Sequence, residues 1–190
     1  MTPSPAPLRA QLRCHPAMPA GVPLSLSVEI RSQADALRLR YTLRGDTAAL
    51  RIPRPAAPVP TDGLWKHTCF EVFVAAQGEA AYREFNFSPS SEWAAYRFSS
   101  ARERDTASEE RERVLLAPLL AHTTPRTFTL TVRVPATALP RSPAMLALGL
   151  SAVIEEKDGR LSYWALHHPY DQPDFHHSDG RTLRLAAPLT

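Results

Sequence analysis

The sequence predicts an all-β protein: an antiparallel β-sandwich of the jelly-roll or immunoglobulin-like type, with about ten strands and at most one short helix. Three observations predict it. The chain has 190 residues, which suits one domain with a real core. It contains 19 prolines against 7 glycines, and internal prolines break helices, so a helical bundle is excluded. Finally, apolar and polar residues alternate in many short segments, as in half-buried strands.

The first strands are expected at 24–30 and 37–43, where apolar residues alternate with polar ones. Gly45 and Asp46 follow, and residues 50–52 are expected to close this pair as an antiparallel meander. Residues 53–60 are rich in proline. They are therefore expected to form an extended connection on the surface.

Three strands joined by tight turns are expected next. Residues 64–75 are almost continuously apolar, which predicts a central strand that is buried on both sides. Residues 82–87 and 93–99 follow as the second and third strands. In the second strand the alternation places two sets of side chains on opposite faces, namely Tyr82, Glu84 and Asn86 on one and Arg83, Phe85 and Phe87 on the other.

Residues 99–124 are predicted to be a charged loop with one or two helical turns, since Pro118 interrupts the apolar stripe that a longer helix needs. Strands resume at 128–134 and 146–154. Asp158-Gly159 predicts a hairpin turn into the strand that follows. A last strand is expected at 182–185.

Composition and charge indicate where the protein works. The net charge is +3, but the basic residues are interleaved with acidic ones or alternate with apolar ones, so neither nucleic acid nor a membrane is an expected partner. Cys14 and Cys69 can form at most one disulfide, and residues 1–22 contain no apolar run typical of a signal peptide. We therefore expect a cytoplasmic protein. Its domains are a proline-rich tail or edge strand at 1–22 and a single β-sandwich at 23–190; the oligomeric state stays open.

Polar residues inside the central strands are the first candidates for a binding site. Glu71, Glu84, Asn86 and Arg97 lie in segments flanked by Phe and Val, where charged side chains are rare. If these strands pair, the four side chains can line one face and bind neighbouring hydroxyl groups. Alternatively, Arg97 forms an ion pair with one of the glutamates on the outside of a sheet. Two carboxylates can also act as a glycosidase acid and nucleophile.

Trp65, Trp93 and Trp164 each lie in or beside a predicted strand. Indole rings stack well on the apolar face of a sugar ring, and they equally pack in protein cores. The sequence alone leaves both roles open for each of the three.

Two histidine pairs lie near the C-terminus, at 167–168 and 176–177. His176, with Asp174 and Asp179, can form a divalent metal site with nitrogen and oxygen ligands. Adjacent histidines diverge in an extended chain, so each pair can supply one ligand to a given ion. The alternative is a structural corner, in which these side chains bond backbone amides before the last strand.

Three segments together resemble a known family: DGLWKHTCFEVFV at 62–74, YREFNFSPSSEWAAYRF at 82–98 and GLSAVIEEKDGRLSYWALHHPYDQPDFHHSDGRTLRL at 149–185. They resemble the bacterial DOMON-like domain family, whose members are similar to family 9 carbohydrate-binding modules. The resemblance covers nearly the whole chain, except the N-terminal tail and residues 99–124.

The resemblance implies a non-catalytic domain that binds a soluble sugar or sugar derivative. The expected ligand-binding residues are Trp65, Glu71, Glu84, Asn86, Trp93, Arg97, Trp164 and His168. A haem is not expected, because Met18 and Met145 are poorly placed to pair with a histidine as axial ligands; no other cofactor is expected, apart from the divalent metal considered above. The alternative functions are a metal- or carboxylate-dependent hydrolase of a small sugar derivative and a protein-interaction domain.

Overall fold

The computed structural model describes residues 6–112, 114, 116, 119–141 and 145–187. Within these residues the chain forms twelve strands, all paired antiparallel, and one α-helix, α1 (Thr106–Arg111). The predicted all-β antiparallel sandwich with one short helix is confirmed. The described part has slightly more strands than the ten expected. Pro118, which was expected to interrupt a helix, lies outside the described residues.

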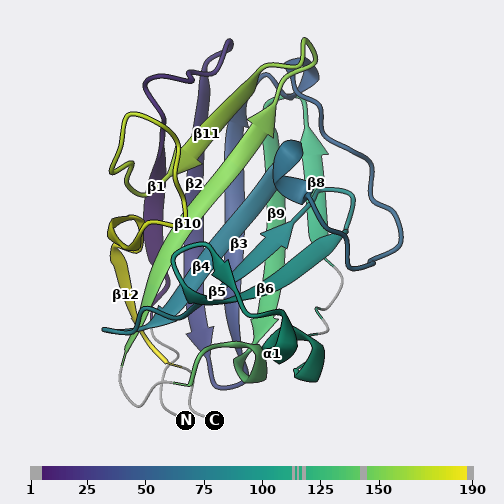
Figure 1. The fold of residues 1–190 in the computed structure, drawn as a ribbon. Coiled ribbons are helices and arrows are strands. Elements are labelled where there is room, and N and C mark those ends of the chain that lie inside the picture. Colours follow the sequence, from purple (N-terminus) through teal and green to yellow (C-terminus); the bar gives the residue numbers. More distant parts are fainter. Residues whose placement is uncertain (1–5, 113, 115, 117–118, 142–144, 188–190) are drawn as a thin grey trace.

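The strands form two layers that lie face to face (Figure 1). The back sheet has the order β1 (Leu8–Cys14), β2 (Leu24–Gln33), β3 (Ala36–Gly45), β9 (Thr127–Pro135) and β8 (Leu120–Thr124). The front sheet has the order β7 (Glu103–Arg104), β6 (Trp93–Ser100), β5 (Tyr82–Phe87), β4 (Cys69–Ala76), β10 (Met145–Glu155) and β11 (Leu161–Ala165). β12 (Leu183–Ala186) pairs with the start of β10.

The N-terminal segment contains a strand that joins the two sheets. The first part of β1 pairs with β2 in the back sheet, and its end pairs with β11, where Cys14 lies opposite Trp164. Residues 1–22 therefore include a strand with neighbours on both sides, at the corner where the two sheets meet. Cys14 and Cys69 are both free thiols.

The connections differ from the predicted meander at one point. Leu50 does not extend the β2–β3 pair. It forms an isolated bridge with Glu156, the residue that follows β10, and β9 takes the place beside β3. Residues 53–59 are an exposed irregular segment, as their prolines predict. The Asp158-Gly159 turn is confirmed, and Gly159 has φ of +89°, a conformation that favours glycine.

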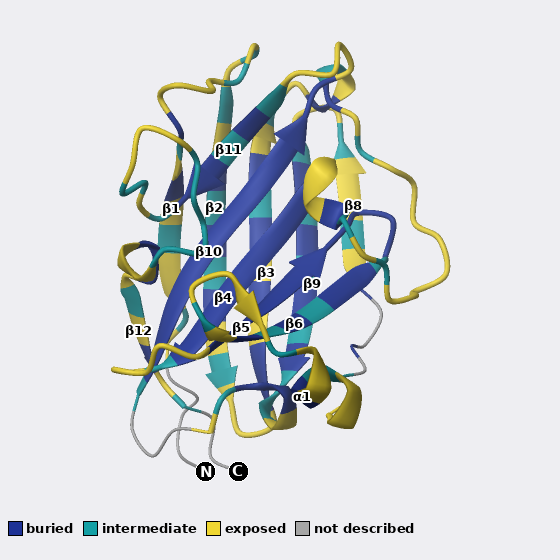
Figure 2. Ribbon diagram, viewed as in Figure 1, coloured by how far each residue is buried: buried dark blue, intermediate teal, exposed yellow. Residues whose placement is uncertain are grey.

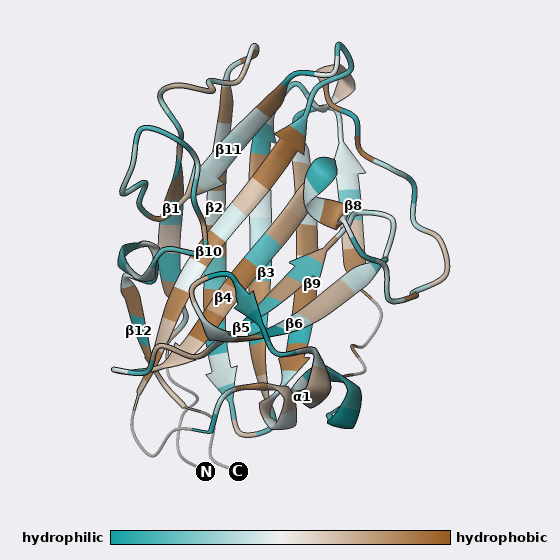
Figure 3. Ribbon diagram, viewed as in Figure 1, coloured by the Kyte–Doolittle hydropathy of each residue, from teal (hydrophilic) through white to brown (hydrophobic). Residues whose placement is uncertain are grey.

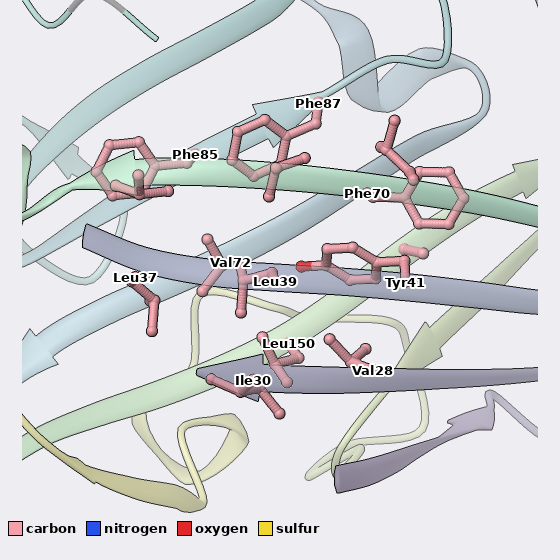
Figure 4. Packing of buried hydrophobic residues seen from close by; sticks show 14 of the residues in the cluster. Val28, Ile30, Leu37, Leu39, Tyr41, Phe70, Val72, Phe85, Phe87 and Leu150 are labelled. Atoms are coloured by element: carbon pink, nitrogen blue, oxygen red, sulfur yellow. The ribbon is translucent and has the colours of Figure 1, made fainter. Parts of the chain in front are cut away.

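The main core lies between the two sheets. The back-sheet strands β2, β3 and β9 alternate between buried and less buried residues, whereas β4 and β10 are buried almost throughout (Figure 2). In β2, β3 and β9 the hydropathy shows matching bands of apolar and polar residues (Figure 3). Figure 4 shows side chains of both sheets packed together, among them Tyr41, Phe70, Phe85 and Leu150. This burial is the main favourable contribution to folding.

The front sheet has a second, smaller apolar cluster on its outer face. Its buried members come from β4, β5, β6 and β10 and from the short 3-10 turn Leu64–Lys66, and they are Leu64, Cys69, Phe73, Ala75, Tyr82, Ala94, Tyr96, Phe98 and Ala147. Phe175, from the long segment between β11 and β12, packs against them. The middle strands of the front sheet are thus covered on both faces, as the continuous apolar run at 64–75 predicted.

One polar contact crosses the core. The hydroxyl of Tyr41, which is fully buried, donates a hydrogen bond to the backbone carbonyl of Glu71 at 2.8 Å. We expect Tyr41→Phe to lower the free energy of unfolding by about 1–2 kcal/mol, because a buried hydrogen bond is lost. Urea unfolding measures this, with Tyr170→Phe at an exposed tyrosine as control. An unchanged stability in Tyr41→Phe would show that this bond contributes nothing.

Candidate functional site

The outer face of the front sheet carries a row of polar side chains. Pairing of β4 with β5 places Glu71 opposite Asn86, and pairing with β10 places Ser151 on the other side of Glu71. Glu84 lies two residues from Asn86 on the same face of β5, opposite Tyr96 of β6. Alternation along neighbouring strands therefore brings two carboxyl groups, an amide and a hydroxyl together on one face.

Above this row lies a hollow of about 390 Å³, which we call the front hollow. This volume falls within the usual range for small-ligand sites. Its aromatic lining residues come from five parts of the chain and are Trp65, Phe73, Tyr96, Phe98, Tyr163 and Phe175. Its charged or titratable lining residues are Glu71, Glu84, Arg102, Arg104 and His176.

Trp65 is the most exposed aromatic side chain of the front hollow. It lies in the 3-10 turn that follows Gly63, whose φ of +77° lets the chain turn there. Its indole is 43% exposed and meets Tyr96 edge-on, with ring centroids 6.1 Å apart. A large flat ring that is held on one side and open on the other suits stacking against a ligand.

The opposite wall of the front hollow comes from β11 and from the segment before β12. Tyr163 and Phe175 have ring centroids 6.1 Å apart. His176 follows, and its Nδ1 lies 2.7 Å from the hydroxyl of Tyr82. Burial, and then the nearby Arg102, lower the pKa of His176 to about 4, so the imidazole is neutral at physiological pH.

The floor of the front hollow holds the two carboxyl groups. Glu71 Oε2 accepts a hydrogen bond from Ser151 at 3.0 Å, and Glu84 Oε1 accepts one from Asn86 Nδ2 at 2.8 Å. Burial, and then the charge of Glu84, raise the pKa of Glu71 to about 8, although the Ser151 hydrogen bond opposes the shift. Burial also raises the pKa of Glu84, to about 7, although the Asn86 hydrogen bond opposes the shift. Both carboxyl groups therefore stay protonated at pH values well above those at which an exposed glutamate ionises.

Two arginines lie at the rim of the front hollow, and each already has a carboxylate partner. Arg102 lies 2.9 Å from Asp174, and Arg104 forms a two-nitrogen contact with Glu109. The Arg104 guanidinium also stacks 4.4 Å over the ring of Tyr96. These contacts hold the side chains of Arg102 and Arg104 in place at the edge of the front hollow.

The structure places three of the predicted ligand-binding residues in the lining of the front hollow, and a fourth, Asn86, is buried beside them in the sheet. Trp65 forms part of the wall, Glu71 and Glu84 form the floor, and Asn86 lies between them in the sheet. Trp93 and Trp164 instead belong to the core between the sheets, and both are buried.

Arg97 and His168 lie elsewhere. The expectation that Arg97 shares the face of the glutamates is wrong, because its register partner is Arg83, on the opposite face of β5 from Glu84. Its ion-pair partner is Glu112 rather than Glu71 or Glu84. His168 packs edge-on against His15 and lies 2.8 Å from the backbone carbonyl of Arg13, outside the lining of the front hollow.

The three residues predicted to bind a metal have other partners. Asp174 pairs with Arg102, His176 with Tyr82, and Asp179 lies 3.8 Å from the ring of His177. Over the described ranges, no group of three or more His, Cys, Asp or Glu side chains is arranged to hold a metal ion. Side-chain bonds to backbone amides at Asp174 and His177 match the alternative of a structural corner.

Sequence reasoning missed most of the aromatic walls. Tyr96 and Phe98 could have been found, because alternation in the strand 93–100 places them on one face. Tyr163 and Phe175 could not, since only the tertiary fold brings β11 and the segment after it against β4 and β6.

No helix within the described residues is long and apolar enough to span a membrane.

Comparison with known proteins supports the fold assignment. No model of a known protein family matches the chain, and no curated protein matches it. A solved structure of a candidate carbohydrate-binding protein from Bacteroides uniformis ATCC 8492 aligns over 98% of this chain and 94% of its own, with a TM-score of 0.67 and 16% identity.

Two further similar structures are of a family 9 carbohydrate-binding module from Caldicellulosiruptor kristjanssonii. The complex with cellotriose has a TM-score of 0.53 at 8% identity and covers 83% of this chain and 72% of that chain. The complex with glucose has a TM-score of 0.51 at 8% identity, covering 83% and 74%. At these identities the likeness shows a shared fold. Membership of the DOMON-like family stays a prediction.

Proposed function

We propose that this protein binds a soluble carbohydrate in the front hollow. The observation that carries the proposal is the combination of aromatic walls and a floor of hydrogen-bonding oxygens, in a cavity of small-ligand size. Aromatic rings stack on the C–H faces of sugars, while carboxyl and amide groups bond their hydroxyls. The similar fold of the module solved with cellotriose and glucose supports the same assignment.

Binding is better supported than hydrolysis. Glu71 and Glu84 are 2% and 5% exposed, and each is hydrogen-bonded to a neighbour in the same sheet. A rigid scaffold holds such groups in place for either task, and the similar folds solved with cellotriose and glucose belong to a carbohydrate-binding module, which favours positioning a ligand. We therefore assign them to recognition of hydroxyl or other donor groups.

The test is a calorimetric titration with glucose and cellotriose, using the wild-type protein and Trp65→Ala. We expect saturable binding that weakens at least about tenfold in Trp65→Ala, because a stacking surface is lost. The melting temperature of this variant should stay within about 2 °C of wild type, since the indole is half exposed.

Tyr170→Ala is the matched control. Tyr170 is an exposed aromatic residue that does not line the front hollow, and its removal should leave binding unchanged. Equal affinities for wild type and Trp65→Ala, or no saturable binding of either sugar, would contradict the proposed function.

A further inference from the structure

The floor of the front hollow has an unbalanced set of charges. Glu71 has no ion-pair partner among the described residues, and Glu84 has only the imidazole of His176, with Nε2 at 3.8 Å. That imidazole is neutral near pH 7 because its pKa is about 4. Near pH 7 these two buried carboxyl groups hold protons to a large extent. Once they ionise, no cation in direct contact compensates them, which is costly.

The rim does not supply the missing cation. Arg102 and Arg104 each have a carboxylate at hydrogen-bond distance, Asp174 and Glu109 respectively. Both arginines still lower the pKa of Glu84 from a distance, and Glu109 raises it. The rim thus offsets the charge of an ionised floor only in part, and a ligand in direct contact can offset the rest.

An independent observation points to a ligand with several hydrogen-bond donors. Asn86 is fully buried, and its Oδ1 is a buried side-chain atom with no hydrogen-bond partner in the described part of the protein. Its Nδ2 is already used by Glu84, and its register partner is Glu71. A buried acceptor without a donor costs free energy, and a hydrogen-bond donor brought to the floor beside Asn86 would recover that cost.

The walls complete a site that is suited to a cation. Six aromatic rings surround the hollow, and ring faces attract ammonium groups, most strongly where water is excluded. An aromatic cage above a carboxylate floor is a recognised arrangement for binding amines. A neutral sugar can bond to the floor only through its hydroxyl groups, whereas an ammonium group would also offset the charge of the ionised carboxylates.

We propose that the front hollow selects a ligand with a positively charged amino group, so that its carbohydrate is an amino sugar. The inference rests on the proposed function and names its ligand class. The ammonium group would lie at the floor, between the two carboxyl groups, and the sugar ring would lie against the aromatic walls.

Binding of such a ligand is coupled to proton release. A bound ammonium stabilises the ionised carboxylates, which in the empty hollow hold protons at neutral pH because of their raised pKa values. The other titratable, charged or hydrogen-bonding groups that interact with this pair come from both sheets and from the segments around the hollow. They are Tyr41, Cys69, Tyr82, Asn86, Tyr96, Arg102, Arg104, Glu109, Ser151 and His176. For choline, whose charge does not titrate, affinity should therefore rise as the pH increases from 6 to 9.

The experiment compares glucosamine, glucose and N-acetylglucosamine by calorimetry at pH 7. We expect glucosamine to bind at least about tenfold more tightly than the two neutral sugars, with protons released to the buffer. In Glu71→Gln/Glu84→Gln the preference should fall to about twofold or less. Glu79→Gln, which changes an exposed glutamate outside the hollow, should keep the full preference.

The outcomes separate this inference from the proposed function. Equal binding of all three sugars, weakened in Trp65→Ala, would overturn the amino-sugar inference and leave carbohydrate binding in place. A preference for glucosamine that survives in the double glutamine variant would also overturn it. If no sugar binds at all, both proposals fail, and choline titrations of wild type and the double variant show whether the floor binds cations of another class.

Discussion

Replacing Trp164 with alanine is expected to lower the free energy of unfolding by about 3–5 kcal/mol. The side chain is 5% exposed and belongs to the core between the sheets. Its indole nitrogen donates a hydrogen bond to Ser162 Oγ at 3.0 Å. It also lies where β1 crosses from the back sheet to the front sheet, between Cys14 and Ala152. The variant thus leaves a cavity at the corner that joins the two layers.

Urea unfolding of Trp164→Ala and Trp65→Ala makes the comparison within one residue type. Trp65→Ala should lose less than about 1 kcal/mol, because much of its indole is already in water. The two substitutions then have different effects: Trp164→Ala lowers stability, and Trp65→Ala weakens binding. If Trp164→Ala has unchanged stability and no longer binds sugar, Trp164 belongs to the ligand site and the core assignment is wrong.

The second large effect is a loss of stability as the pH rises. Glu71 and Glu84 have pKa values of about 8 and about 7 in the folded protein, above the value near 4.5 of an exposed glutamate. Between these limits the folded state binds more protons than the unfolded state, so stability falls with increasing pH. The stabilising contribution of these two groups is fully present below about pH 4.5, and it is fully lost above about pH 8. At about 1.4 kcal/mol per pKa unit, the raised pKa values of the two groups together correspond to a loss on the order of 8 kcal/mol.

The measurement is the unfolding free energy of wild type and Glu71→Gln/Glu84→Gln between pH 5 and 9. The wild type should lose stability over this range, whereas the double variant, which cannot ionise at these positions, should lose much less and exceed the wild type at pH 9. Glu79→Gln should follow the wild type, because that side chain is exposed. Parallel curves for wild type and double variant would contradict the raised pKa values.

Local pattern predicted much of the fold. Alternation located β2, β3, β9 and β10, and the Asp158-Gly159 pair located the turn between β10 and β11, because strand faces and tight turns depend on nearby residues. The place of Leu50 opposite Glu156 could not be found in this way, since it depends on how the two sheets pack.

The candidate site was predictable to the extent that strand parity determines it. Alternation places Glu84 and Asn86 on one face of β5, and Glu71 pairs in register with Asn86, so the sequence could indicate the floor of the front hollow. Arg97 fell on the other face because its position depends on the register between β5 and β6, which the sequence does not specify. Phe175 reaches the site through a long irregular segment, and no periodic pattern encodes such a contact.

The most direct test of the central claim follows the three tryptophan indole signals by nuclear magnetic resonance while glucose or glucosamine is added. The three rings report on different places: Trp65 on the front hollow, and Trp93 and Trp164 on the core. Carbohydrate binding in the front hollow predicts a saturable shift of the Trp65 signal, with the other two nearly unchanged. A saturable shift at Trp93 or Trp164 with Trp65 unmoved, or no shift at any of the three, would contradict it.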